Sequence, residues 1–149
     1  DIEHAEIAQP DWQIGIIGHE DDTFKGSNLH NVSNVHFLGN KNPKDLADYI
    51  RAFDVTINPQ LVNELTRGNY PRKIDEYLAM GKPVVATKTE FMTYFEAFCY
   101  LSTNKINFVS MIEKALKEDN PTRQQSRAEF AHTHSWENNV QKIYELIEM

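Results

Sequence analysis

Cysteine is almost absent from this sequence, and no long apolar run occurs in it. Cys99 is the single cysteine in 149 residues, which excludes an internal disulfide and any multi-cysteine metal site. Its position within the apolar stretch 97–101 predicts an ordinary buried side chain. No stretch approaches the roughly 18 consecutive apolar residues that a membrane-spanning helix needs.

Basic residues are also few. The sequence has 15 Lys and Arg against 22 Asp and Glu, a formal net charge of −7. Coating of nucleic acid is therefore excluded, because neutralisation of phosphates needs clustered cations. The length, with 40% hydrophobic and 25% charged residues, is typical of one globular domain.

Several well-known motifs are missing as well. Neither a P-loop nor Gly-x-Gly-x-x-Gly occurs, and no serine stands in a Gly-x-Ser-x-Gly setting. His132 and His134 lie two residues apart in a predicted helix, so their side chains point in different directions and are poorly placed to bind one metal ion together. The acidic loop 19–22 has ligands suited to a divalent cation, but the pattern favours a solvated loop. We expect no metal ion.

Short apolar runs alternate with helical patterns along the chain. Buried strands are predicted at 12–18, 34–39, 54–59 and 82–87, with a weaker one at 98–102. Helices are predicted at 42–53 (Asn42 as N-cap), 70–81, 106–117, from Pro121, and from Trp136 to the end, with short helical turns within 19–34 and 90–98. This order predicts a Rossmann-like α/β domain, with a parallel sheet covered by helices on both faces and a helical C-terminus.

The opening twelve residues resemble the end of a helix that runs into a loop. An α/β unit that opens in this way predicts that a preceding strand has been cut away. We therefore expect residues 1–149 to be a fragment that is truncated at its N-terminus.

The richest of the predicted strand-to-helix loops is 58–72, at the carboxyl edge where ligands bind in open α/β sheets. It leads into a helix with Pro71, Arg72 and Lys73 in its first turn, which is a suitable anion site. At 100° per residue, one face of this helix packs on the sheet and the other faces solvent. The inner face has Ile74, Tyr77, Leu78 and Gly81, and the outer face has Arg72, Asp75, Glu76 and Ala79. These spacings alone favour a solvated ion pair of Glu76 with Arg72 or Lys73.

A wider pattern points elsewhere. The segment YPRKIDEYLAMGKPVVAT, residues 70–87, resembles the donor-binding segment of GT-B glycosyltransferases, in particular family 4 (group 1) and its relatives. The matching residues are Pro71, Lys73, Glu76, Tyr77, Leu78, Ala79, Gly81, Lys82, Pro83, Val84 and Val85. Residues 34–59 are similar to the preceding strand–helix–strand unit of that family. The helix from Trp136 looks like the C-terminal helix that reaches back toward the partner domain.

The resemblance implies a nucleotide-sugar-binding role for the whole chain. Glu76 would accept hydrogen bonds from the ribose hydroxyls of a UDP- or GDP-sugar, and Lys73 would offset the diphosphate charge. The other implied contacts are Gly18, His19, Asn40, Lys41, Asn63, Glu64, Thr66, Tyr70 and Arg72. It also implies transfer with retention of configuration, no metal, and a cytoplasmic enzyme that acts at the inner face of a membrane in polysaccharide or glycolipid synthesis. No catalytic residue is nominated.

The sequence departs from the family pattern at three places. A second glutamate usually lies eight residues before the ribose-binding one, but position 68 is glycine, so that contact is missing or comes from Glu64. The basic pair that holds the diphosphate in the family has no counterpart here. The acceptor-binding N-terminal domain has none either. Two alternatives remain: half of a sugar-nucleotide epimerase, and a non-catalytic binding domain of flavodoxin-like shape.

Overall fold

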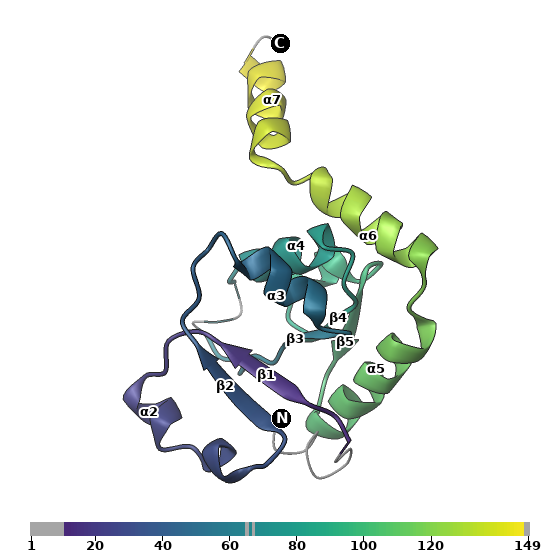
Figure 1. Cartoon of the computed structure of the whole chain (residues 1–149). Coiled ribbons are helices and arrows are strands. Elements are labelled where there is room, and N and C mark those ends of the chain that lie inside the picture. Colours follow the sequence, from purple (N-terminus) through teal and green to yellow (C-terminus); the bar gives the residue numbers. More distant parts are fainter. Residues whose placement is uncertain (1–10, 65, 67, 148–149) are drawn as a thin grey trace.

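The computed structural model describes residues 11–64, 66 and 68–147. The helix end that we expect in the opening residues therefore lies almost wholly outside the described part. All five predicted strands and the predicted helices form (Figure 1). In chain order the elements are β1 (Ile14–Ile17), α2 (Asp22–Lys25), η1 (Asn28–Asn31), β2 (Val35–Gly39), α3 (Leu46–Ala52), β3 (Thr56–Asn58), α4 (Arg72–Ala79), β4 (Val84–Thr87), η2 (Phe91–Phe95), β5 (Cys99–Ser102), α5 (Lys105–Glu118), α6 (Pro121–His132) and α7 (Trp136–Ile147).

The strands form two parallel sheets, where the sequence predicts one. β1 pairs with β2, and the second sheet has the order β3-β4-β5. Within the described residues, β1 and β3 each pair on one edge only, so no ladder of hydrogen bonds joins the two sheets. The parallel class was correctly predicted, whereas the continuity of the sheet was not.

β4 lies at the centre of the larger sheet, and its side chains alternate between two cores. Val84 and Ala86 are fully buried against one face, and Val85 is fully buried against the other. The first core contains residues of α4, η2 and α6, and the second contains the inner face of α5. Because each strand residue points opposite to its neighbour, this alternation confirms that helices cover both faces.

Cys99 on β5 belongs to the first core, as its apolar surroundings predict. Burial raises the pKa of its thiol to about 12, opposed in part by the charge of Arg127. A thiol that stays protonated at neutral pH is a poor nucleophile, so Cys99 has a structural role.

The smaller sheet contacts the segment that follows α3. A Cβ atom added at Gly15 of β1 would lie 2.8 Å from the ring of Phe53, so glycine allows that ring to pack against the strand. The prediction that Asn42 caps α3 is wrong. Its side chain accepts a hydrogen bond from the Lys44 amide at 3.0 Å and closes a turn, and α3 begins at Leu46.

The chain from Lys105 onward is helical apart from short turns, as predicted. α5 and α6 begin at asparagine caps, Asn104 and Asn120, whose side chains accept from the amides three residues later. α7 projects away from the remainder of the domain (Figure 1), and no residue of it is buried. In the described part of the chain, no helix combines the length and the apolar character required to cross a membrane.

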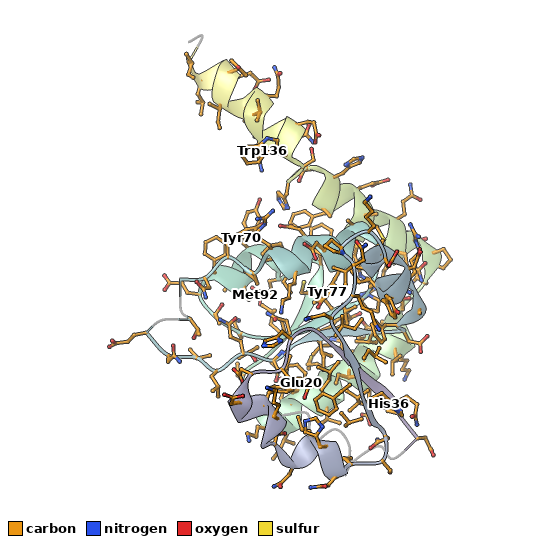
Figure 2. The ribbon with its side chains drawn as sticks, turned by 60° about the vertical axis from the view of Figure 1, so that its left-hand side comes forward. Glu20, His36, Tyr70, Tyr77, Met92 and Trp136 are labelled. Atoms are coloured by element: carbon orange, nitrogen blue, oxygen red, sulfur yellow. The ribbon has the colours of Figure 1, made fainter. Side chains whose placement is uncertain are left out.

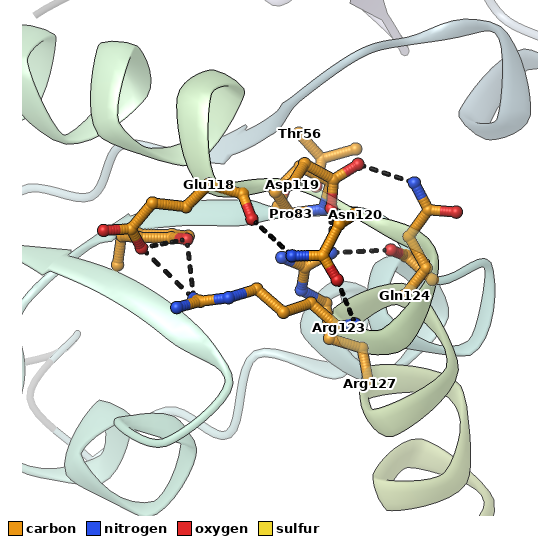
Figure 3. A network of polar contacts seen from close by, with 10 residues as sticks. Thr56, Pro83, Glu118, Asp119, Asn120, Arg123, Gln124 and Arg127 are labelled. Carbon is orange, nitrogen blue, oxygen red and sulfur yellow. Dashed lines mark hydrogen bonds and ion pairs between the residues drawn. The ribbon is translucent and has the colours of Figure 1, made fainter.

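Arg127 attaches α6 to the end of α4. Its side chain is 3% exposed, donates to the Gly81 carbonyl at 2.9 Å and pairs with Asp119 at 2.6 Å (Figure 3). Gly81 has φ of 71°, and a Cβ atom there would lie 3.2 Å from the backbone oxygen of Gln124. The close approach of α6 to α4 therefore depends on a glycine and a buried arginine.

We predict that Arg127→Ala destabilises the domain by about 2–4 kcal/mol, because it leaves a buried carbonyl and a partly buried carboxylate without their donor. Urea unfolding measures the change. Arg123→Ala is the matched control, since Arg123 pairs with Glu118 at the surface and its loss should cost less than about 1 kcal/mol. Equal losses for the two variants would contradict this account.

Candidate functional site

α4 has the two faces that its sequence predicts. Ile74 and Leu78 have no exposed surface and face the first core. Arg72, Lys73 and Glu76 are exposed. The inward side of the helix is fixed by burial of apolar area, so the residues at the opposite positions are held toward solvent at its amino end.

The amino end of α4 is open. Pro71 precedes the helix and no side chain caps it. The Arg72 amide donates to the Tyr70 carbonyl at 3.1 Å and the Ile74 amide donates to the Pro71 carbonyl at 2.8 Å. The positive charge of this end therefore comes from the helix dipole together with the side chains of Arg72 and Lys73. Among the described residues no ion pair joins Glu76 to Arg72 or Lys73, so the solvated pair that the spacings favour does not form.

Asp75 does not lie on the solvent side with Glu76, and this part of the prediction is wrong. Its carboxylate accepts a short hydrogen bond from the Tyr70 hydroxyl and another from His134 Nδ1 at 3.0 Å. The Nε2 atom of the same histidine shares a hydrogen bond of 2.8 Å with the Tyr94 hydroxyl. We call these four residues, Tyr70, Asp75, His134 and Tyr94, the aromatic clamp.

The environment of Tyr70 keeps its hydroxyl protonated. Burial raises the pKa of Tyr70 well above its usual value, and the hydrogen bond and negative charge of Asp75 raise it further. The hydroxyl therefore acts as a donor at all physiological pH values, which fits the acceptor role of Asp75.

A broad hollow of about 860 Å³ lies beside the clamp. It is lined by Glu64, Gly68, Tyr70, Glu90, Phe91, Thr93, Tyr94, His134 and Asn139. Tyr70 contacts Phe91 edge to face, with ring centroids 5.2 Å apart. Figure 2 shows Tyr70 beside α4, on the side from which Trp136 and α7 project. Neither Glu76 nor Lys73 lines this hollow, but Tyr70 adjoins both regions, since its carbonyl accepts from the Arg72 amide at 3.1 Å.

The loop before α4 is closed by its own polar groups. Thr66 Oγ1 accepts from the Asn63 amide at 2.9 Å and donates to the Leu61 carbonyl, and Asn63 Oδ1 accepts from the Thr66 amide at 3.0 Å. The Thr66 hydroxyl therefore orders the loop, and the contact of Thr66 with the donor stays a prediction. Glu64 is exposed and lines the hollow.

The remaining expected contacts lie on the smaller sheet. The Gly18 amide donates to the Gly39 carbonyl at 3.2 Å, so the carboxyl ends of β1 and β2 are adjacent. Lys41 Nζ lies 5.2 Å from the ring centroid of Tyr49, and Asn40 and His19 are exposed. Within the described ranges no hydrogen bond or ion pair links this group to α4 or its loop.

The acidic loop is explained by local interactions. Asp21 accepts from the Phe24 amide at 2.8 Å as the N-cap of α2, Glu20 lies 3.0 Å from His30, and Asp22 pairs with Lys25. Across the residues with described positions, no three His, Cys, Asp or Glu side chains gather as a metal site.

Three residues of the clamp, Asp75, Tyr94 and His134, were not among the contacts predicted from the sequence. Tyr94 is 57% exposed, and His134 was considered in the sequence only as a possible metal ligand. Residues 75, 94 and 134 come from three separate elements, so no local spacing brings them together. The turn between α6 and α7 places His134, whose side chain is only 10% exposed, against α4.

Comparison with known families decides the relationship of the chain. Residues 2–116 match the model of the family described as glycosyl transferases group 1. The chain belongs to this family. The matched residues include α4, the loop before it and η2, and therefore the residues of the loop and of η2 that line the hollow.

Individual relatives agree with this assignment. One relative, from Bacillus subtilis (strain 168), is named for a proposed role as the teichuronic acid biosynthesis glycosyltransferase TuaH. It is 29% identical over 144 residues, and the aligned part covers 91% of this chain and 36% of that protein. The crystal structure of WaaG, a glycosyltransferase involved in lipopolysaccharide biosynthesis, has a TM-score of 0.61 at 18% identity, over 89% of this chain and 37% of WaaG. The fold is thus the Rossmann-like GT-B fold that the sequence predicts, and the chain spans little more than a third of either relative.

We predict that Asp75→Asn lowers the pKa of Tyr70 toward the usual tyrosine value, because it removes the negative charge and weakens the hydrogen bond that raise it. Titration of the tyrosine ring signals by NMR between pH 8 and pH 12, roughly two units about the ordinary tyrosine value, measures the change. Asp48→Asn, at an exposed pair with Arg51 on α3, is the control and should leave Tyr70 unchanged.

Proposed function

We propose that this domain binds a nucleoside-diphosphate sugar at the amino end of α4, for a protein that transfers the sugar to an acceptor. The observation that carries the proposal is the exposed Glu76 carboxylate, one turn inside a helix whose uncapped end bears Arg72 and Lys73. The combination offers positive charge for a diphosphate and an acceptor for neighbouring hydroxyls.

The chemistry would follow from these charges. When the bond between the anomeric carbon and the diphosphate breaks, the diphosphate leaves with the bonding electrons and its negative charge increases. The positive end of the α4 dipole and the Lys73 side chain would stabilise that charge, which lowers the barrier to departure. Glu76 would hold the ribose and so position the diphosphate. A UDP- or GDP-sugar donor, retention of configuration and independence of a metal ion are the forms of this reaction that the family resemblance supports.

The rest of the active site would come from outside residues 1–149. The chain covers 36% of the teichuronic acid relative, which is consistent with a second, acceptor-binding domain in the same protein. Both sheets end in edge strands, and one more parallel strand would pair with the free edge of β1 or of β3. We propose that the chain is part of such a two-domain protein.

α7 offers a surface for that second domain. Trp136, Val140, Ile143, Tyr144 and Ile147 recur at helical spacing, and four of them are more than half exposed. An apolar stripe of this size is characteristic of a docking surface. The names of the two relatives support synthesis of a surface polysaccharide or glycolipid, with the complete protein acting in the cytoplasm at the inner face of a membrane.

We predict that UDP or GDP, without magnesium, raises the thermal stability of the chain, and that Glu76→Ala weakens this binding about 10- to 100-fold through loss of charge-assisted hydrogen bonds. Calorimetric titration with UDP, GDP and ADP measures it. Glu129→Ala on α6 is the control, because Glu129 is an exposed glutamate that accepts a hydrogen bond from Gln125 on the same helix. Binding of FMN alone, or unchanged nucleotide binding in Glu76→Ala, would contradict the proposal.

We further predict that amide hydrogen exchange at β1, β3 and α7 is slower in a protein that contains both domains than in residues 1–149 alone. Pairing of the strand edges and docking of α7 would remove these amides from water. Mass spectrometry of both proteins compares the same peptides, with α5 as an internal reference because it is already packed on β4 and β5. Equal exchange at all three elements would exclude the two-domain arrangement.

A further inference from the structure

His134 lies between two partners that use the two nitrogen atoms of its ring. Nδ1 is 3.0 Å from the carboxylate of Asp75, and Nε2 is 2.8 Å from the hydroxyl of Tyr94. Because a carboxylate only accepts hydrogen bonds, the proton of the neutral imidazole is on Nδ1. Nε2 therefore has a free lone pair, to which the Tyr94 hydroxyl donates. Asp75 thus fixes the direction of both hydrogen bonds.

The rings around His134 keep it away from water. Its imidazole packs edge to face on Phe130, with the ring centroids 4.6 Å apart, and lies 6.3 Å from the ring centroid of Phe95. The side chain is only 10% exposed. Hydrogen bonds are stronger where water is excluded. The lone pair on Nε2 is therefore held as a proton acceptor for Tyr94.

Tyr94 is the exposed end of this series of hydrogen bonds. It is 57% exposed and lines the hollow. Because its hydrogen is directed at Nε2 of His134, its oxygen can accept a hydrogen bond from a ligand hydroxyl in the hollow. Tyr70 is the opposite case, since burial and the charge of Asp75 raise its pKa and its oxygen keeps its proton. Of the two tyrosines in the clamp, Tyr94 is the one arranged to exchange a proton.

A hydroxyl, an imidazole and a carboxylate joined in this order form the arrangement of an activated acid–base group. The imidazole takes the proton of the hydroxyl, and the carboxylate stabilises the imidazolium that results. The three members come from η2, from the turn after α6 and from α4. A link that only holds the turn on α4 requires His134 and Asp75, but it does not require an exposed hydroxyl aligned on the far side of the ring.

We propose that Tyr94, His134 and Asp75 form a proton relay that opens into the hollow and accepts the proton of an alcohol. The alcohol would give its proton to Tyr94 Oη while the Tyr94 proton moves to His134 Nε2, and the imidazolium would stay paired with Asp75. The alcohol oxygen would use the freed electron pair to bond to the anomeric carbon, and the diphosphate would leave with the electrons of the bond that breaks.

This inference rests on the proposed function, which it deepens by giving the transfer reaction a general base. Tyr94 is then the catalytic residue, because it touches the alcohol, and His134 and Asp75 act through it. Afterwards the imidazolium would return its proton through Tyr94 to water, so that the relay is ready for another alcohol.

Acetylation by N-acetylimidazole tests the relay in the 149-residue chain. The tyrosine oxygen bonds to the acetyl carbon, imidazole departs with the electrons of the C–N bond, and the phenolic proton of Tyr94 passes to His134. Tyr144 is the internal reference, because it is 58% exposed and its helix, α7, contains no histidine. We expect Tyr94 to react at least about tenfold faster, since a positioned base typically contributes about 100-fold or more. Mass spectrometry of the two peptides measures both rates.

His134→Gln separates proton transfer from structure. Glutamine keeps an oxygen that accepts from the Tyr94 hydroxyl but cannot take up its proton, so Tyr94 should then react within about twofold of the Tyr144 rate. His132→Gln is the matched control, because His132 is exposed at the end of α6, and it should leave the ratio of the two rates unchanged.

Asp75→Asn is a second and independent variant. Its amide can donate to Nδ1 of His134, which places the ring proton on Nε2 and removes the acceptor for the Tyr94 hydroxyl. The excess rate at Tyr94 should then disappear. If His134→Gln does not fold, as shown by its amide NMR spectrum, Asp75→Asn decides in the same way.

Equal rates at Tyr94 and Tyr144 in the unaltered chain would overturn the relay. An excess rate at Tyr94 that survives in a folded His134→Gln or Asp75→Asn protein would do the same. Acetylation requires no nucleotide, so a negative result here would leave the proposal of nucleotide binding at α4 standing. Conversely, failure of the UDP titration would contradict that proposal without affecting the reactivity of Tyr94.

Discussion

Burial of Ile74 and Leu78 against β4 is the constraint on which the candidate site depends. These two side chains have no exposed surface, and their contacts with Val84 and Ala86 set the rotation of α4 about its axis. With that rotation fixed, residues 72, 73 and 76 face solvent, whereas Asp75 faces the turn that follows α6. A rotation of one residue, about 100°, would move Glu76 to the position of Asp75 and eliminate both the open anion site and the clamp.

The apolar core thus divides the polar groups of one short helix between two tasks. Glu76, Arg72 and Lys73 stay in water, where their interactions are weak until a ligand or a second domain excludes solvent. Asp75, partly removed from water, forms directed hydrogen bonds with Tyr70 and His134. Arg127 reinforces this division from the other end, because it holds α6 on Gly81 and so delivers His134 to α4.

The sequence was sufficient for the features that depend on local patterns. The apolar runs predicted all five strands, and helical spacing predicted the inner face of α4 and the positions of α5, α6 and α7. It failed where tertiary contacts decide. Asn42 has the side chain of a helix cap but forms a turn, since α3 begins four residues later. The division of the sheet follows from edges that meet no partner, and the clamp joins residues 59 positions apart in sequence, so neither leaves a local signature.

The charge distribution distinguishes the amino end of α4 from the hollow beside it. In a chain of net charge −7, cations at the first turn of α4 provide a local exception, and they lie outside the acidic, aromatic hollow. Tyr70 lies at the boundary, with its carbonyl bonded to the Arg72 amide and its ring in the hollow. A diphosphate at the first turn of α4 would therefore lie beside Arg72 and Lys73, whereas the same group displaced into the hollow would approach the carboxylates of Glu64 and Glu90.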